Sequence, residues 1–248
     1  MATRVLALFA AIGVFLAAGS STAWAWAEGS VITWGSPTNI SGDSDVSTAG
    51  TLVAAFNMNG PAVMVNGVDF ASWMFTTNTT STTMGNFTFA ETSHILTASG
   101  LGSGNAPFSG LSANYQTLLS TALTTDENNT LTLTINGLTL GHNYEFQFFL
   151  NGSNTAGADN FRTTASAPNP VTLDDNTTNT IGGTGQYVIG TFNAGDVNEI
   201  ITFTGTDNTQ APTVNAFQLR DLSVVPEPST LALIAIGSAL SGLIRRKH

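Results

Sequence analysis

The chain has 248 residues, of which only 9% are charged, with a formal net charge of −10 and no cysteine. The lack of cysteine excludes disulfides, thiolate metal sites and thiol catalysis. Residues 28–225 hold 15 of the 16 acidic residues, only two of the six basic ones and no lysine, so this part has a charge near −13. Such a body cannot neutralise a phosphate backbone, which argues against nucleic acid as a partner, and it repels anionic polysaccharides.

The first 27 residues have the order of a secretory signal peptide. Arg4 precedes an apolar stretch over residues 5–18, and small and polar residues then lead to Ala25, Trp26 and Ala27. A basic start, an apolar middle and a small-x-small end predict cleavage by signal peptidase after Ala27 or after Ala25. An uncleaved membrane anchor is the alternative, and both predict that the bulk of the chain is exported.

Alternation of apolar and polar residues dominates residues 28–222 and indicates β-structure. Asn66-Gly67 separates two short apolar runs, which is typical of a type I′ hairpin turn. Leucine alternates with threonine over residues 130–135, and apolar side chains on both faces of 144–150 indicate a central strand. The Thr-rich run 76–83 is expected to be a solvated loop or an edge. Further strands are expected at 31–34, 50–58, 86–91, 161–165, 171–173, 186–193, 198–204 and 213–222.

One helix is expected between residues 111 and 123, with Ser112 as its N-cap. The residues at helical spacing are Leu111, Tyr115, Leu118, Leu119, Ala122 and Leu123. These elements predict an all-β fold, a jelly-roll-like β-sandwich with one short packed helix. We expect a single exported domain over residues 28–222, with a division near residue 110 as the alternative. A signal helix precedes it and a transmembrane helix follows it in this scheme.

Two acidic turns are candidates for binding Ca²⁺, which prefers six to eight oxygen ligands. Asp43 and Asp45 lie two residues apart in a Ser- and Gly-containing turn, and Asp174 and Asp175 follow the strand expected at 171–173. The alternative is a pair of solvated turns in which aspartate caps the backbone. Titration calorimetry with Ca²⁺ distinguishes calcium sites from solvated turns, because a trace without heat of binding excludes the calcium sites.

Trp34 and Trp73 are the tryptophans that remain after cleavage at Ala27, and each is a candidate for stacking on a sugar ring. Packing in the core is the alternative for both. The sequence holds no G-x-S-x-G, H-E-x-x-H or phosphate-binding glycine motif, and we therefore assign no catalytic residues.

The C-terminal residues 223–248 have a third pattern. Pro226, Glu227 and Pro228 precede an apolar run over 231–244, and the basic tail of Arg245, Arg246, Lys247 and His248 closes the chain. Fourteen apolar residues form roughly 21 Å of helix, so the run is a transmembrane helix of marginal length whose basic tail stays in the cytoplasm.

The C-terminal pattern resembles the PEP-CTERM sorting signal, which exosortases recognise in bacteria that make exopolysaccharide. The resemblance implies that an exosortase cleaves at or near the Pro-Glu-Pro element. The protein is then released or transferred to the cell surface. A tethered protein that is never processed is the alternative.

The central domain also resembles galactose-binding-like and malectin-like β-sandwiches. The residues that carry this likeness are Gly137, Leu138, Gly141, the run 144–149, Arg162 and the closing segment 214–219. The resemblance implies binding of a neutral polysaccharide. We therefore expect a non-catalytic envelope or matrix protein with a structural or adhesive role. The alternative is a secreted carbohydrate-active hydrolase, since fifteen acidic residues make some suitable carboxylate pair unavoidable.

Overall fold

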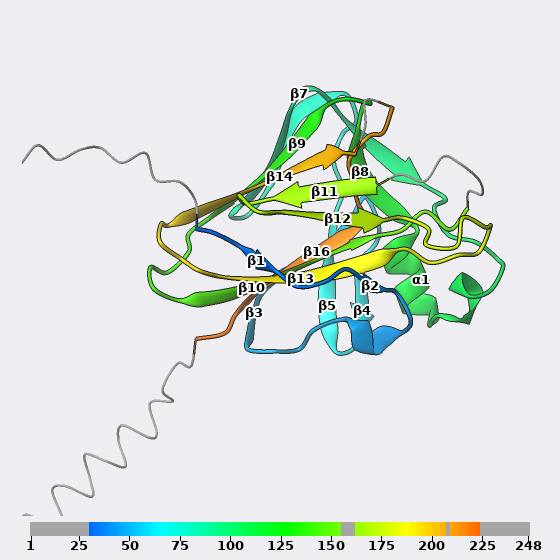
Figure 1. The fold of residues 1–248 in the computed structure, drawn as a ribbon, viewed down its shortest axis with the longest axis horizontal. Helices are drawn as coiled ribbons and strands as arrows, with labels where there is room; N and C mark the ends of the chain where they lie inside the picture. The colour runs from blue at the N-terminus through cyan, green and yellow to red at the C-terminus, as the bar shows by residue number, and fades with distance from the viewer. Residues whose placement is uncertain (1–29, 155–161, 207–208, 224–248) are drawn as a thin grey trace, which may run out of the picture.

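Two β-sheets packed face to face form the body of the computed structural model, which describes residues 30–154, 162–206 and 209–223 (Figure 1). The first sheet has the order β1 (Thr33–Trp34), β13 (Gln186–Asn193), β10 (Asn143–Leu150), β16 (Ala216–Asp221), β3 (Thr51–Met58), β5 (Val68–Trp73) and β4 (Val63–Val65), and β2 (Thr38–Asn39) also pairs with β13. All its pairs are antiparallel except β3 with β5.

The second sheet is antiparallel throughout its described pairs. Its order is β12 (Pro170–Asp174), β11 (Arg162–Ser166), β14 (Asn198–Gly205), β9 (Thr130–Asn136), β7 (Phe87–Ser99), β8 (Thr121–Thr125) and β15 (Thr213–Val214), with β6 (Thr79–Met84) paired to β7. Both sheets contain strands from before and after residue 110 that pair with each other, for example β16 with β3 and β7 with β9. The expected β-sandwich is thus confirmed, together with one α-helix.

Aromatic side chains fill the space between the sheets. Phe217 of β16 lies at the centre, with ring centroids 5.4 Å from Phe56, 5.7 Å from Phe89 and 5.5 Å from Phe146. Because side chains alternate along a strand, Phe149 points to the outer face of the first sheet, where it contacts Tyr115 at 6.1 Å. β10 is therefore buried over nearly its whole length, including its polar residues Glu145 and Gln147.

The helix α1 spans Ala113–Leu119 and covers that outer face. The Ser112 hydroxyl accepts a hydrogen bond from the Tyr115 N–H at 3.2 Å, which confirms the predicted N-cap. The helix is shorter than expected, because Ala122 and Leu123 belong to strand β8. Their side chains are buried, and β8 is hydrogen-bonded to β7, so pairing within the sheet overrides the helical spacing of the sequence.

Two short 3₁₀ helices, Asp43–Asp45 and Phe108–Gly110, complete the described elements. Asn66 and Gly67 have φ angles of 49° and 74°, as the predicted type I′ turn between β4 and β5 requires. The Thr-rich run forms the edge strand β6, in agreement with one of its two expected forms.

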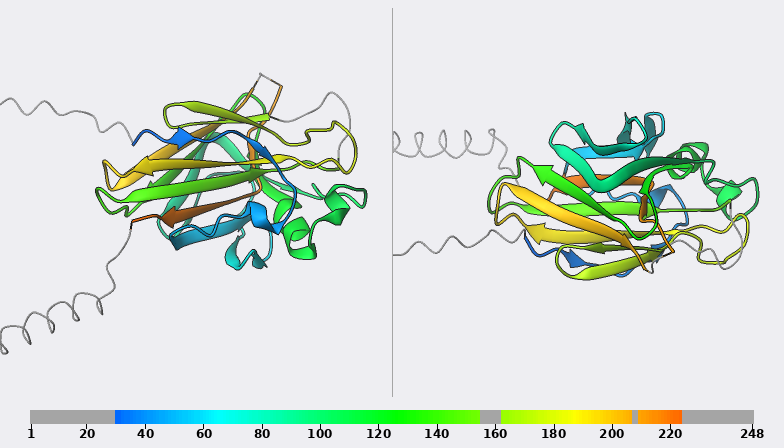
Figure 2. Two further views of the ribbon diagram at one scale, coloured as in Figure 1. Left: turned by 60° about the horizontal axis from the view of Figure 1, so that its bottom comes forward. Right: turned by 90° about the horizontal axis from the view of Figure 1, so that it is seen from above.

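The two described ends of the chain lie at the same end of the sandwich, and α1 lies at the other (Figures 1 and 2). Val31 and Leu222 line one shared hollow, and the Leu222 N–H donates to the Asn143 carbonyl at the start of β10. No helix among the described ranges is long and apolar enough to cross a bilayer. The predicted signal peptide and C-terminal transmembrane helix lie outside the described residues.

Candidate functional site

A cavity of about 580 Å³ opens at the end of the sandwich away from the described chain ends. It is lined by three carboxylates, one amide, three hydroxyls and three small or aliphatic side chains: Asp126, Glu127, Asp175, Asn151, Thr124, Thr125, Thr213, Ala98, Leu101 and Ala211. Polar groups that accept and donate hydrogen bonds therefore surround a small apolar surface, and this described lining contains no aromatic ring.

Two buried asparagines are bonded to each other beside the cavity: Asn151 lines it, and Asn215 contacts Asn151. The Asn215 side chain donates to the carbonyls of Leu119 at 2.9 Å, Thr121 at 3.0 Å and Asn151 at 3.2 Å, and it accepts from the Asn151 N–H at 2.8 Å. The Asn151 side chain in turn accepts from the Ser153 hydroxyl at 2.9 Å. Both asparagines are almost fully buried, so this network holds α1, β8, β10 and β16 in a fixed arrangement below the cavity.

Asp175 is held against the loop that follows β10. The Gly152 N–H donates to the Asp175 carbonyl at 2.8 Å, and a Cβ atom at Gly152 would lie 2.2 Å from Asp175 Oδ2. A side chain at position 152 would therefore displace this carboxylate. Glycine is needed here for close approach of the backbone rather than for a positive φ angle.

Asp126 lies exposed at the mouth of the cavity. Its Oδ2 is 3.2 Å from Nδ1 of His94, and both side chains are about half exposed, at 50% and 51%. An ion pair with this exposure contributes little to stability because solvent screens it. The carboxylate can thus exchange this partner for a ligand at small cost.

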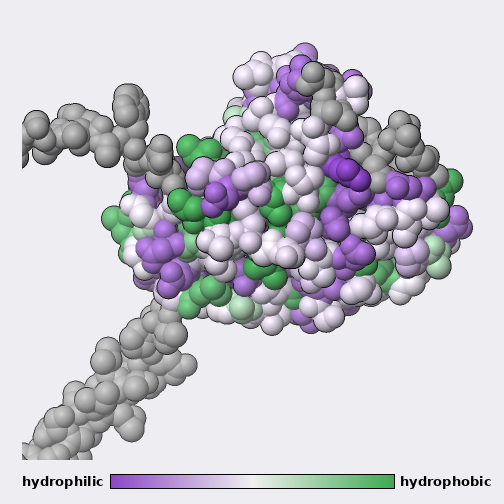
Figure 3. All heavy atoms as spheres, in the orientation of Figure 1, coloured by the Kyte–Doolittle hydropathy of each residue, from purple (hydrophilic) through white to green (hydrophobic). Residues whose placement is uncertain are grey.

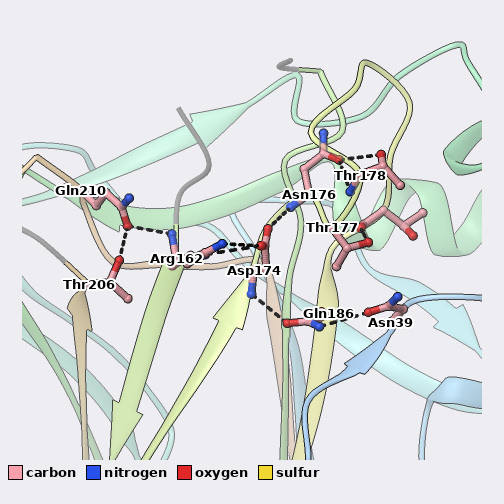
Figure 4. A network of polar contacts seen from close by, with 10 residues as sticks. Asn39, Arg162, Asp174, Asn176, Thr177, Thr178, Gln186, Thr206 and Gln210 are labelled. Atoms are coloured by element: carbon pink, nitrogen blue, oxygen red, sulfur yellow. Dashed lines mark hydrogen bonds and ion pairs between the residues drawn. The ribbon is translucent and has the colours of Figure 1, made fainter. Parts of the chain in front are cut away.

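Asp174 lies within a network of polar contacts between neighbouring strands (Figure 4). Arg162 lies 3.3 Å from Asp174 Oδ2, the Asn176 N–H donates to its Oδ1 at 3.0 Å, and the Asp174 N–H donates to Gln186. This network joins β11, β12 and β13 beside the cavity. Of the two aspartates that were predicted to act together, Asp175 lines the cavity and Asp174 does not.

Asp43 and Asp45 stabilise the first 3₁₀ helix. Asp45 Oδ2 accepts from the N–H groups of Ser41 at 2.7 Å and Gly42 at 3.0 Å, and from the Tyr115 hydroxyl at 3.3 Å. Burial raises the pKa of Tyr115, and the neighbouring Asp45 raises it further. The Ser112 hydroxyl donates to Asp43 Oδ1 at 2.6 Å, which connects this turn to α1. Asp45 thus caps the backbone of its own turn, whereas the contact of Asp43 is with a side-chain hydroxyl.

The two acidic turns do not assemble a recognisable calcium site. Over residues 30–154, 162–206 and 209–223, no group of three or more His, Asp or Glu side chains is placed to hold a metal ion. The oxygens of Asp45 face hydrogen-bond donors, which a cation would have to replace. Calcium binding stays a prediction of the sequence.

The two tryptophans occupy different environments. Trp73 is 1% exposed, packs edge-on against Phe56 at 5.0 Å, and donates its indole N–H to Thr82 at 3.1 Å. Its ring presents no face to a ligand, which corrects the expectation of a sugar-stacking role. Trp34 is partly exposed, and its N–H donates to the Asn169 carbonyl at 2.9 Å, across the edge between the two sheets. Neither residue lines the cavity.

Sequence reasoning found only Asp175 among the cavity residues. Asn215 lies in the segment 214–219, which resembles the last strand of galactose-binding-like domains, but the residues next to it in the sequence do not predict that its amide is buried. The sorting and cleavage residues Ala25, Ala27, 226–228 and 245–247 lie outside the described residues.

A search of the curated proteins gives no match. Among solved structures, the chain is similar to an exo-β-1,3-galactanase from Phanerochaete chrysosporium with galactose, at 20% identity and a TM-score of 0.31, over 63% of this chain and 32% of the galactanase. The chain thus spans about a third of that enzyme's length. It is also similar to a carbohydrate-binding module from the β-sandwich superfamily, at 12% identity and a TM-score of 0.27, over 63% and 66% of the two chains.

The family comparison concerns the C-terminal residues. The model of the PEP-CTERM protein-sorting motif matches residues 224–247. This match confirms the resemblance inferred from the Pro-Glu-Pro element, the apolar run and the basic tail. The chain therefore ends in a PEP-CTERM sorting motif, the signal of proteins exported and processed through the exosortase system.

Proposed function

We propose that this chain is an exported, non-catalytic protein that exosortase delivers to the cell envelope or the extracellular matrix, where its β-sandwich binds neutral carbohydrate. The sorting motif at residues 224–247 is the observation that supports delivery by exosortase. The polar cavity, at the end of the sandwich away from the described chain ends, is the observation that supports carbohydrate binding. In this proposal signal peptidase removes residues 1–27, and the C-terminal helix holds the chain in the membrane until exosortase acts.

The position of the cavity supports a role in display. Asn143, at the start of β10, is bonded to Leu222 just before the sorting motif, and Asn151, at the other end of β10, lines the cavity. Eight residues of extended chain separate them by roughly 26 Å. A body tethered through its C-terminus thus holds the cavity away from the membrane, where a polymer in the surrounding matrix can reach it.

The chemistry of the cavity supports a neutral, hydroxyl-rich ligand. The carboxylates of Asp126, Glu127 and Asp175 can accept hydrogen bonds from sugar hydroxyls. The Asn151 amide donates to the carbonyls of Leu101 and Leu119 at 3.3 Å and so fixes the wall of the cavity. Three carboxylates together disfavour an anionic polymer. The surface beyond the cavity has small, separated hydrophobic groups on the face seen in Figure 3 rather than one broad apolar patch.

The connections between the strands support the jelly-roll class. The chain passes from one sheet to the other at β9–β10, β10–β11, β12–β13 and β13–β14.

The positions of the acidic residues support a non-catalytic role. A glycoside hydrolase needs an acid with a raised pKa beside a second carboxylate. Burial raises the pKa of Glu199 to about 7, but Glu199 lies at the opposite end of the sandwich from the cavity.

The test of carbohydrate binding compares two glycine variants of the exported protein. Gly152→Ala places a Cβ against Asp175 and is expected to weaken binding about tenfold, the scale of one or two lost hydrogen bonds. Gly110→Ala, where a Cβ meets nothing within 4 Å, is the matched control and should bind like wild type. Dextran, galactan and xylan serve as neutral probes and alginate as the anionic one.

Each outcome of this experiment decides one element of the proposal. Binding to no neutral probe, or equal binding by the two variants, would remove the cavity from the proposal. Release of reducing sugar by the wild-type protein, lost in Asp126→Asn, would establish the hydrolase alternative instead. A mature protein that ends at Lys247-His248 would contradict processing by exosortase.

A further inference from the structure

Three aliphatic residues are exposed at the end of the sandwich where the described chain begins and ends. Val31 lies just before β1, Leu140 in the loop between β9 and β10, and Val197 in the loop between β13 and β14. They are 54%, 59% and 52% exposed, and we name them the aliphatic triplet. Single exposed aliphatic residues are common on protein surfaces, so only their grouping is informative.

Hydrogen bonds bring the segments that carry the triplet together. The Leu138 N–H donates to the Val197 carbonyl at 2.9 Å, which joins the two loops. The Gly195 N–H donates to the Ser30 hydroxyl at 2.9 Å, next to Val31. Both loops lie at the same end of the body as the described chain ends (Figure 1). Three separate segments thus present an aliphatic residue at one end of the molecule.

Few charges surround the triplet. The loops 137–142 and 194–197 contain one acidic residue, Asp196, and one histidine, His142, whose Nδ1 is 2.7 Å from Asp221 Oδ2. Residues 28–225 hold no lysine, so this end has no flexible cation for acidic lipid headgroups. Exposed aliphatic groups on an acidic body suit a zwitterionic bilayer surface, because an anionic surface would repel the body.

The length of chain beyond Ser223 limits how far this end can lie from a bilayer. Residues 224–230 separate Ser223 from the apolar run 231–244, and seven extended residues reach at most about 25 Å. The Leu222 N–H is bonded to the Asn143 carbonyl, so the chain leaves the body beside the loop that carries Leu140. A tether this short keeps the effective concentration of the triplet at the bilayer in the millimolar range.

We propose that Val31, Leu140 and Val197 rest on the surface of a zwitterionic lipid bilayer while the protein is tethered through its C-terminus. This inference rests on the tether of the proposed function. Three side chains bury little apolar surface, so the contact is weak without the tether and ends when exosortase cuts it. While it lasts, the contact directs β10 away from the membrane and holds the carbohydrate cavity outward.

Fluorophores attached at single cysteines test the contact, because the chain has no cysteine of its own. The exported protein, purified with its C-terminal tail from cells without exosortase, is reconstituted in phosphatidylcholine vesicles. Leu140→Cys and Val197→Cys carry a polarity-sensitive fluorophore at the proposed contact. Met64→Cys, beside α1, and Ile181→Cys, in the loop after β12, are the matched controls, since both residues are 51% exposed and lie away from the triplet.

We expect the fluorophores at positions 140 and 197 to emit at shorter wavelength and to be quenched by lipid that carries a nitroxide near its headgroup. Those at positions 64 and 181 should show neither change. Replacing half of the lipid by phosphatidylglycerol should reduce the quenching, because the acidic body is repelled. Protein already trimmed by exosortase should show no quenching with the same vesicles.

A second pair of variants tests the side chains themselves. Leu140→Ser combined with Val197→Ser should abolish the quenching of a fluorophore at Val31→Cys, because the remaining aliphatic surface is too small to hold the contact. Met64→Ser combined with Ile181→Ser should leave that quenching unchanged. Equal quenching in the two double variants would overturn the assignment of the contact to the triplet.

Flotation of the vesicles distinguishes failure of the tether from failure of the contact. Tail-bearing protein that does not float with the vesicles would contradict the tether itself. Protein that floats but is quenched equally at positions 64, 140, 181 and 197 would overturn the contact and leave the tether intact. A wavelength shift that grows with protein density and needs no nitroxide lipid would assign the triplet to a second copy of the chain. Stronger quenching in phosphatidylglycerol vesicles would overturn the choice of a zwitterionic surface.

Discussion

Trp73→Ala is the perturbation that best tests the packing between the two sheets. The indole is 1% exposed and has ring centroids 5.0 Å from Phe56, 5.6 Å from Phe89 and 6.3 Å from Phe217. Its N–H donates to the Thr82 hydroxyl at 3.1 Å, a bond that also ties the edge strand β6 to the core. The substitution therefore removes a large buried ring from the centre of the sandwich.

The expected cost is about 3–5 kcal/mol of unfolding free energy, the range for truncating a buried Trp or Phe to alanine. Domains of this kind have about 5–15 kcal/mol in total, so the variant should fold with reduced stability. At 2–4 °C for each kcal/mol in a domain of this size, Tm should fall by about 6–20 °C. Urea unfolding and calorimetry of the processed protein measure both quantities.

Trp34→Ala is the matched control. Trp34 is partly exposed and lies at the edge of the sheet, with ring contacts to Phe146 at 6.2 Å and Phe148 at 6.1 Å. Its loss should cost clearly less than that of Trp73. Fluorescence of Trp34→Phe reports Trp73 once the signal peptide is removed, and acrylamide should quench it poorly. A stability loss below about 1 kcal/mol for Trp73→Ala, or efficient quenching, would refute its placement in the core.

Three further predictions concern other parts of the molecule. Asn215→Ala strips partners from several buried groups below the cavity and should cost at least about 2 kcal/mol in urea unfolding, whereas near-wild-type stability would contradict the network. Burial alone would raise the pKa of Asp221, but hydrogen bonds from His142 and from the Ser223 N–H lower it overall. A carboxyl group whose pKa is lowered in the folded state stabilises the protein above its unfolded pKa, near 3.9, and this stability is lost as the pH falls through the folded pKa. His142→Ala should therefore move the acid-unfolding midpoint to higher pH. An unchanged midpoint would argue against this bond. Replacing residues 226–228 by alanine should leave the C-terminal tail on the protein, and mass spectrometry showing the same trimmed end as wild type would disprove recognition of this element.

Local patterns in the sequence predicted most of the individual elements. The turn at Asn66-Gly67, the N-cap at Ser112 and the central strand β10 were all expected, because each depends on neighbouring residues or on side-chain alternation. The C-terminal sorting motif was also predicted from the sequence, since it is a contiguous segment of residues. The end of the helix was wrong, because residues 121–125 exchange helical spacing for hydrogen bonds to β7.

The sequence by itself determined the C-terminal sorting motif, the acidic lysine-free body and the β-rich class, all of which follow from composition or from short contiguous patterns. Tertiary structure decided which acids share a site and which tryptophan is buried. Asp126, Asn151 and Asp175 come from three separate segments and meet because strands distant in the chain pair side by side. Glu199 likewise looks like any acidic strand residue until packing places it beside Ser30 and away from water. Such non-local contacts depend on the register of whole sheets, which no short window of sequence specifies.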